Sequence, residues 1–276
     1  MVEARLRPGD ACRTLSQSLQ RPAQPQITWI GHSTVLVEMD GIRLVTDPLL
    51  RMKMAHLRRV HAPPAEIAGM VDAVLVSHVH FDHLDLPSLR LVSSEHWIVP
   101  RGAGRLLRRR GLDAVCEVVE GEQVSVGPVS VLATHAEHRA RRSPLAARVP
   151  ALGFLISGSA RVYFAGDTDV FPAMSDLKPK PDVGLLPISG WGPRVPSGHM
   201  DPHRAAEALA LIQPRFVIPI HWGTYVRLGL STDAATLREP AERFESLAAE
   251  LAPDAAVRVL SPGESFLIPP VTTGAV

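Results

Sequence analysis

The chain has 276 residues, of which 46% are hydrophobic, and its 29 basic and 28 acidic residues give a net charge of +1. This length and composition suit a globular protein with a large core, and the near-zero charge argues against a nucleic-acid partner. No segment approaches the roughly 18–20 apolar residues that cross a bilayer, and no secretory signal is recognisable. We therefore expect a cytoplasmic protein without a membrane span, whose oligomeric state stays open.

The order of the predicted elements indicates an α/β fold. Residues 1–25 lack hydrophobic periodicity and contain two prolines near their end, which predicts an arm leading into one domain over residues 26–276. Short strands are predicted over residues 27–60 and again over about 114–165. Helices are predicted at residues 85–94, 101–110, 202–213 and 235–251. Two mixed sheets flanked by helices are compatible with this order.

The most informative segment follows the apolar run at residues 71–76, which is typical of a short buried strand. His78 and His80 lie two residues apart, so extended backbone would direct both imidazoles to one face. Asp82 and His83 lie just beyond, where a turn would direct them to a second position. Imidazole with carboxylate support suits borderline-soft metals. The segment therefore predicts a metal site.

A site for two metals needs more donors than this segment holds. Three later predicted strands end at suitable residues: 129–134 at His135, 161–165 before Asp167, and 216–220 at His221. His138 is the alternative to His135, because only three residues separate them. The sequence thus predicts that distant strand ends complete one centre.

His199 precedes Asp201 and Pro202, which are typical of an N-cap and a first helical residue. A histidine fixed at the start of a capped helix can face an oxyanion or a leaving group, so a catalytic role and a structural role both stay open. His32 is interpreted either as a residue that orients a ligand or as a hydrogen-bonded turn histidine.

Over residues 27–265, these patterns resemble the metallo-β-lactamase fold superfamily. The narrower likeness is to the branch of L-ascorbate-6-phosphate lactonase-like hydrolases and N-acylphosphatidylethanolamine-hydrolysing phospholipase D-like enzymes. Besides the histidine segment, this likeness is carried by Trp29-Ile30-Gly31-His32-Ser33-Thr34, Thr46-Asp47-Pro48, His83-Leu84-Asp85, Ala165-Gly166-Asp167-Thr168, Leu186-Pro187-Ile188, His199-Met200-Asp201-Pro202 and His221-Trp222-Gly223-Thr224.

The resemblance implies a four-layer αββα sandwich with two divalent metal ions. Zinc is expected, and manganese and iron are alternatives. Asp47 would orient a ligand, with a turn residue before Pro48 as the alternative interpretation, and Asp82 would also take part in catalysis. The implied ligands are His78, His80 and His135 for one metal, Asp82, His83 and His221 for the other, and Asp167 as a bridge between them.

The resemblance further implies a hydrolase in which metal-activated water attacks a phosphodiester, a lactone or a related ester of a small molecule. The chain has no Gly-x-Ser-x-Gly motif, so a serine nucleophile is the weaker hypothesis. Two other classes stay open: a metal-dependent binding or sensing module without catalysis, and a di-iron redox protein. Long Gly/Pro- and Arg-containing loops are expected to shape a substrate pocket with Trp191, Trp222, Tyr225 and Arg139.

Overall fold

The computed structural model describes residues 24–63, 70–143, 145–189, 195–229 and 233–270. The predicted arm over residues 1–25 therefore lies almost entirely outside the described residues. Within them, no helix is both long enough and apolar enough to pass through a lipid bilayer.

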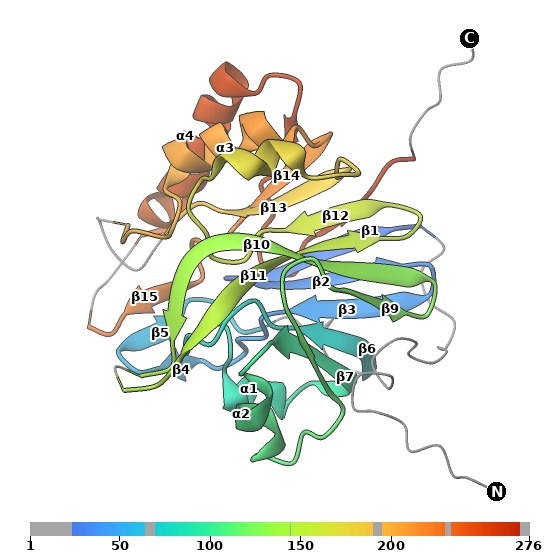
Figure 1. The fold of residues 1–276 in the computed structure, drawn as a ribbon. Coiled ribbons are helices and arrows are strands. Elements are labelled where there is room, and N and C mark those ends of the chain that lie inside the picture. Colours follow the sequence, from blue (N-terminus) through green and yellow to red (C-terminus); the bar gives the residue numbers. More distant parts are fainter. Residues whose placement is uncertain (1–23, 64–69, 144, 190–194, 230–232, 271–276) are drawn as a thin grey trace, which may run out of the picture.

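Two seven-stranded mixed sheets form the centre of the molecule (Figure 1). The first sheet contains, in spatial order, β17 (Ser265–Leu267), β1 (Gln26–Gly31), β2 (Thr34–Met39), β3 (Ile42–Thr46), β6 (Met70–Leu75), β7 (Ser93–Pro100) and β8 (Val115–Val118). The second contains β16 (Ala256–Val257), β14 (Phe216–Ile220), β13 (Val183–Pro187), β12 (Arg161–Phe164), β11 (Arg148–Ser157), β10 (Val129–Arg141) and β9 (Gln123–Val126). In each sheet, neighbouring strands are partly parallel and partly antiparallel.

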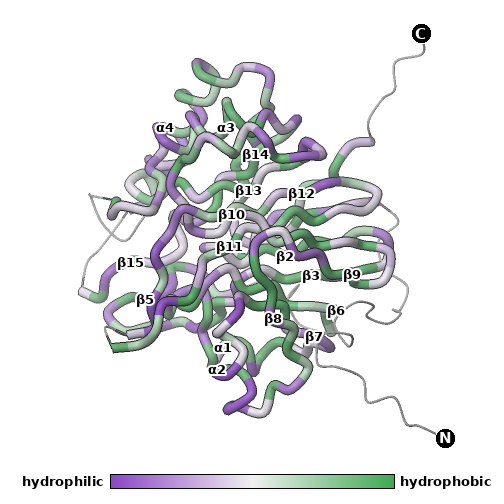
Figure 2. Tube along the Cα trace, viewed as in Figure 1, coloured by the Kyte–Doolittle hydropathy of each residue, from purple (hydrophilic) through white to green (hydrophobic). Residues whose placement is uncertain are grey.

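Strand β2 shows why the first sheet is buried on both faces. Side chains alternate along a strand, so Val35 and Val37 pack into the core between the sheets, whereas Leu36 packs into a second core on the outer face. All three side chains are at most 1% exposed. Hydrophobic residues accordingly gather along the central strands (Figure 2). Burial of apolar surface on both faces stabilises the layered arrangement.

Helices cover the outer faces of the two sheets (Figure 1). Leu89 of α1 (Leu86–Leu89) and Leu107 of α2 (Gly104–Arg108) belong to the outer core of the first sheet. Helices α3 (Pro202–Ile212) and α4 (Ala234–Leu251) cover the second sheet, and a 3-10 turn, η3 (Pro172–Asp176), contacts α3. The predicted α/β class, with two mixed sheets flanked by helices, is confirmed.

A small third sheet lies beside the ends of the main strands. It consists of β4 (Lys53–Met54), β5 (Leu57–Arg59) and β15 (Tyr225–Arg227). Its middle strand carries Arg59, which is only 2% exposed and donates hydrogen bonds to the carbonyl oxygens of Ile30, Leu49 and His61. Arg59 thereby joins this small sheet to the end of β1.

Several strands end at the same side of the sandwich. Strands β3 and β6 are parallel, and Thr46 pairs with Leu75 at their carboxyl ends. Strands β12, β13 and β14 are parallel in the other sheet, so the residues after Phe164 and after Ile220 also leave the sandwich at one edge. Histidines and aspartates follow these strand ends directly, which brings residues from both sheets together.

Candidate metal centre

The first cluster of donor atoms combines the loop after β6 with strand β10. The Nδ1 atom of His80 lies 3.0 Å from Nε2 of His78 and 3.1 Å from Nε2 of His138. His78 is fully buried, and the other two side chains are partly buried. Donors bound tetrahedrally to zinc at about 2.0–2.1 Å stand about 3.3 Å apart, so this spacing is close to that of three zinc ligands.

The sequence predicts that His135 joins His78 and His80, but the structure places its side chain elsewhere. The His135 side chain is 43% exposed and contacts Glu120, Glu137 and Phe171. Strand β10 does not end at residue 134 but continues to Arg141, and its pairing with β11 shifts register between His135 and Arg139. This bulge re-aims the side chains beyond it, so the alternative residue His138 occupies the cluster.

Hydrogen bonds fix the protonation of two of the three rings in the first cluster. Ser77 Oγ donates to Asp47 Oδ2 at 2.5 Å and so accepts from Nδ1 of His78 at 2.9 Å. The Gly198 carbonyl oxygen accepts from Nδ1 of His138 at 2.7 Å. Burial lowers the pKa of both rings, to about 4 for His138, so each is neutral near pH 7 and its Nε2 atom carries a lone pair.

These two lone pairs and the Nδ1 atom of His80 converge on one point. A proton on His80 can be donated to only one of the two neighbouring nitrogens, so hydrogen bonding does not satisfy all three atoms. A single cation accepts all three lone pairs. The donor chemistry of the first cluster therefore fits a metal ion.

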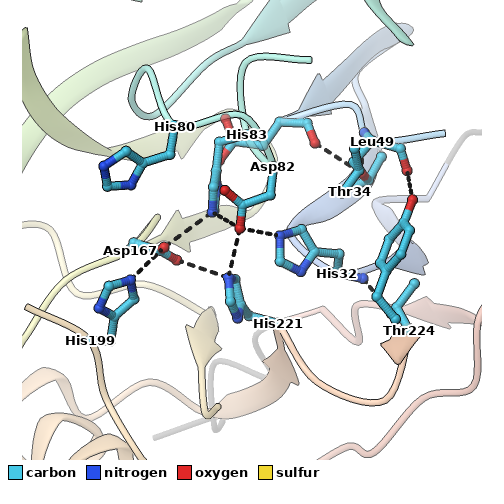
Figure 3. A network of polar contacts seen from close by, with 12 residues as sticks. His32, Thr34, Leu49, His80, Asp82, His83, Asp167, His199, His221 and Thr224 are labelled. Carbon is cyan, nitrogen blue, oxygen red and sulfur yellow. Dashed lines mark hydrogen bonds and ion pairs between the residues drawn. The ribbon is translucent and has the colours of Figure 1, made fainter. Parts of the chain in front are cut away.

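The second cluster contains His32, Asp82, His83 and His221. One carboxylate oxygen, Oδ2 of Asp82, lies 3.3 Å from Nε2 of His32, 3.6 Å from Nε2 of His83 and 3.9 Å from Nε2 of His221 (Figure 3). The three histidines are at most 4% exposed. The predicted trio of Asp82, His83 and His221 is thus brought together, and His32 joins it.

Asp167, on the loop after β12, lies between the two clusters. Its Oδ2 atom is 3.9 Å from Nε2 of His78. The same atom is 3.1 Å from Nε2 of His83, and Oδ1 is 3.5 Å from Nε2 of His221 (Figure 3). Burial raises the pKa of Asp167, but His221 and His83 lower it more, so the carboxyl is ionised. This position is the one expected of a carboxylate shared by two metals.

The surroundings of His83 favour a positive charge. Burial lowers its pKa, but the carboxylates of Asp167, Asp82 and Asp47 raise it well above the ordinary value. Although Nε2 of His83 is near Asp167, neither this atom nor Oδ1 of Asp167 makes a well-aligned hydrogen bond. A divalent cation between them satisfies both atoms and the excess negative charge.

Asp47 connects the two clusters through hydrogen bonds, as expected for a residue that orients ligands. Its Oδ2 atom lies 2.7 Å from Nδ1 of His83, and the same atom accepts the hydroxyl of Ser77, which in turn holds His78. Asp47 is fully buried. One carboxylate therefore directs the Nε2 atoms of His78 and His83 toward the two clusters, and such partners raise metal affinity.

His199 lies at the more open side of the centre. Its side chain is 18% exposed, and its Nε2 atom lies 3.3 Å from Oδ2 of Asp167 (Figure 3). Burial lowers the pKa of His199, but the hydrogen bond and charge of Asp167 raise it above the ordinary value. The predicted helix start is confirmed: Asp201 caps α3 by accepting from the Arg204 amide, with Pro202 following. This cap fixes the backbone next to His199.

The structure does not gather the described members of the predicted substrate-binding set in one pocket. Trp191 lies outside the described residues, and Arg139 is exposed on β10. Trp222 stacks on Trp29 at 5.0 Å, and these two rings line a cavity of about 370 Å³ whose lining contains no residue of the two clusters. Tyr225 is 8% exposed and donates to the Arg51 carbonyl oxygen. Their roles toward substrate stay predictions.

Several supporting residues had no clear signal in the sequence. Arg142 donates to the carbonyl oxygens of Val79, His80 and Leu84 and stacks over the Phe81 ring at 3.9 Å. It therefore holds the histidine loop in place. Ser77 bonds both Asp47 and His78, and its position next to His78 in the sequence is the one signal of this role. The partners of Arg59 are the carbonyl oxygens of Ile30, Leu49 and His61, and backbone acceptors leave no pattern in the sequence.

Comparison with known proteins places this geometry in context. A family model described as a β-lactamase superfamily domain matches residues 42–222. A metal-dependent hydrolase from Caldivirga maquilingensis is 30% identical, with 88% of this chain and 98% of that protein covered. N-acyl-phosphatidylethanolamine-hydrolyzing phospholipase D 1 from Caenorhabditis elegans is 32% identical, with 72% and 64% covered.

The fold is also shared with solved structures. A metallo hydrolase from the archaeon Ignicoccus hospitalis has a TM-score of 0.66 at 25% identity, with 88% of this chain and 98% of that one covered. By contrast, this chain spans 59% of the length of an uncharacterized relative from Mycobacterium tuberculosis, at 32% identity.

Proposed function

Since this chain belongs to the β-lactamase superfamily, we propose that it is a hydrolase that uses two divalent metal ions to cleave a phosphodiester or a related ester. One observation carries the proposal: two clusters of buried or partly buried imidazoles lie on either side of one ionised carboxylate, Asp167. This arrangement suits two metal ions that share one carboxylate ligand.

The described residues divide between two metal positions. His78, His80 and His138 would hold one ion, while Asp82, His83 and His221 would hold the other, with Asp167 in contact with both. Two bound cations of this kind lower the pKa of a water molecule and stabilise the negative charge that develops on an ester. Asp47 and Ser77 keep the ligand rings in the required tautomers.

A phosphodiester is the favoured substrate class. Two relatives, from Caenorhabditis elegans and Saccharomyces cerevisiae, are named as phospholipases D that hydrolyse N-acyl-phosphatidylethanolamine, which is a phosphodiester. The motifs also resemble lactonase-like hydrolases, so a lactone is the second candidate. Zinc is the proposed metal, because imidazole-rich sites suit it better than magnesium or calcium.

His199 is proposed to act on the substrate side of the centre. Its raised pKa lets it carry a proton that can be donated to a leaving oxygen, and Asp167 orients its Nε2 atom. His199→Ala should keep both metals while turnover falls by about 100-fold or more, the usual range for a lost general acid. His203→Ala, at an exposed position of α3, is the matched control. Unchanged turnover in His199→Ala would assign His199 to structure alone.

The proposal is tested by metal analysis together with turnover. Gently purified protein should contain close to two zinc ions and should hydrolyse bis(p-nitrophenyl) phosphate faster than a panel of small lactones. Chelation should abolish turnover, and added zinc should restore it. Two zincs without hydrolysis of any ester would indicate a binding or sensing module instead. Two iron ions with redox activity would indicate the di-iron alternative.

A further inference from the structure

His32 offers a nitrogen donor that the family resemblance did not include among the ligands. We propose that His32 coordinates the metal ion held by Asp82, His83 and His221 and supplies its third imidazole. This inference rests on the proposed function, because it requires a metal at that position. It changes the composition of the second position from two imidazoles to three.

The distances support coordination by His32. Its Nε2 atom lies 3.3 Å from Oδ2 of Asp82, and this same oxygen faces Nε2 of His83 and His221 (Figure 3). One donor atom from each of the four residues lies within 4.8 Å of the other three. Two neighbouring donors on one zinc, each at about 2.0–2.1 Å, stand roughly 3–3.5 Å apart, so Nε2 of His32 and Oδ2 of Asp82 are close enough to bind the same ion.

The ring of His32 is also packed directly against that of another proposed ligand. The centroids of His32 and His221 are 4.0 Å apart, and the ring of Tyr225 meets His32 edge-on at 6.1 Å. The His32 side chain is 2% exposed. Burial among rings limits its orientations, so its Nε2 atom stays directed at Asp82.

The backbone of His32 is held in a conformation that few side chains adopt. Its φ angle is +54°, and the preceding Gly31 has a φ angle of +124°. A Cβ atom on Gly31 would lie 2.7 Å from the Arg59 guanidinium, so no larger residue fits there without displacing Arg59. Strained backbone of this kind persists where the surroundings fix it, and it clusters at functional sites.

Three hydrogen bonds fix this turn. The amide of His32 donates to Thr224 Oγ1 at 2.6 Å, and its carbonyl oxygen accepts from Trp29 Nε1 at 2.9 Å. The same carbonyl oxygen accepts from the amide of His221 at 3.0 Å. His32 is thus hydrogen-bonded through the backbone to His221, which fixes the positions of the two residues relative to each other. A histidine needed only to fill a turn would not require this link to a ligand.

The alternative role is that of a positioning residue. A proton on Nε2 of His32 would be donated to Oδ2 of Asp82 and would orient that carboxylate without contact with the metal. Coordination requires the opposite tautomer, with the proton on Nδ1. The two roles therefore differ in one observable, the protonation of Nε2 when metal is bound.

Coordination by His32 has a consequence for metal selection. Three imidazoles at the second position would match the three imidazoles of His78, His80 and His138 at the first. Nitrogen-rich sites favour zinc over manganese and magnesium, which prefer oxygen ligands. Loss of His32 should therefore weaken zinc at one position more than it weakens manganese.

The test uses nitrogen NMR of ¹⁵N-histidine-labelled full-length protein loaded with zinc. We expect Nε2 of His32 to resonate where metal-bound imidazole nitrogens do and Nδ1 to carry the proton. His32→Asn identifies the signal and keeps the turn, because asparagine tolerates a positive φ angle. Zinc competition with a chromophoric chelator should show that His32→Ala loses more than about 100-fold affinity at one position, beyond the roughly 10–100-fold typical of outer partners. His61→Ala, an exposed histidine, should lose none.

The outcomes separate the inference from the function on which it rests. A proton on Nε2 of His32 in the zinc-loaded protein would overturn coordination and leave a positioning role. Wild-type zinc affinity in both His32→Asn and His32→Ala would overturn it as well. If His32→Ala does not fold, the NMR signal and the His32→Asn affinity decide alone. A wild-type protein that binds no zinc would instead refute the proposed function itself.

Discussion

Asp167→Ala is expected to reduce the bound metal from two ions toward one and to lower turnover by more than about 100- to 1000-fold, the range for losing a preorganised charge at a reacting centre. The reason is geometric. The Asp167 carboxylate lies 3.1–3.9 Å from imidazole nitrogens of both clusters, and it is ionised although buried. Without it, each position loses an anionic ligand, and the two cations lose the charge that screens them from each other.

Metal content by inductively coupled plasma mass spectrometry and turnover of a phosphodiester measure this effect together. Asp169→Ala is the matched control, since Asp169 is two residues away and pairs with Arg204 outside the clusters. The control should keep two metals. Full turnover with two metals in Asp167→Ala would remove Asp167 from the ligand set. Asp167→Asn, which keeps the side-chain volume, separates the loss of charge from a packing defect.

His138→Ala is expected to lose the metal at the first position, whereas His135→Ala should keep both metals. His138 directs Nε2 to within 3.1 Å of His80, but His135 is exposed and pairs with Glu120. The loss in affinity should exceed about 100-fold, because His138 is placed as a ligand and not as an outer partner. Zinc titration against a chelator, with both variants side by side, gives the comparison.

The pair tests the structural correction directly. Both variants remove one imidazole from the same strand, so an effect of histidine number alone would affect them equally. Loss of metal in His135→Ala with retention in His138→Ala would put His135 in the ligand set and remove His138 from it. Circular dichroism of both variants controls for loss of the fold.

Some strands and helix starts can be predicted from short-range sequence patterns alone. Strand β14 has the predicted bounds, 216–220, because a β-branched apolar run ends at His221. Helix α3 begins where Asp201 and Pro202 predicted. The helix predicted over residues 85–94 is instead a single turn, α1, because strand β7 begins at Ser93 and pairs with β6. The end of this helix therefore depends on strand pairing between distant residues, which local composition does not reveal.

Most donor residues of the site could be predicted from the sequence, because they directly follow strand ends. The spacing of His78, His80, Asp82 and His83 in one segment, and the later Asp167 and His221, indicated residues that the structure does bring together. The sequence does not decide between His135 and His138, because the strand continues through a bulge and a bulge depends on pairing with β11. The placement of His32 depends on Thr224, which lies 192 residues away, and on Arg59. Such contacts leave no local pattern.

The division of ligands between the sheets has a mechanical consequence. His78, His80, Asp82 and His83 extend from the first sheet, whereas His138, Asp167 and His221 extend from the second. Each metal ion would therefore crosslink the two sheets at the edge where their strands end. Binding to the folded state alone adds about 2.7 kcal/mol per ion at a free metal concentration 100 times the dissociation constant. A lower concentration of free metal would then reduce the free energy of unfolding of the two-sheet sandwich.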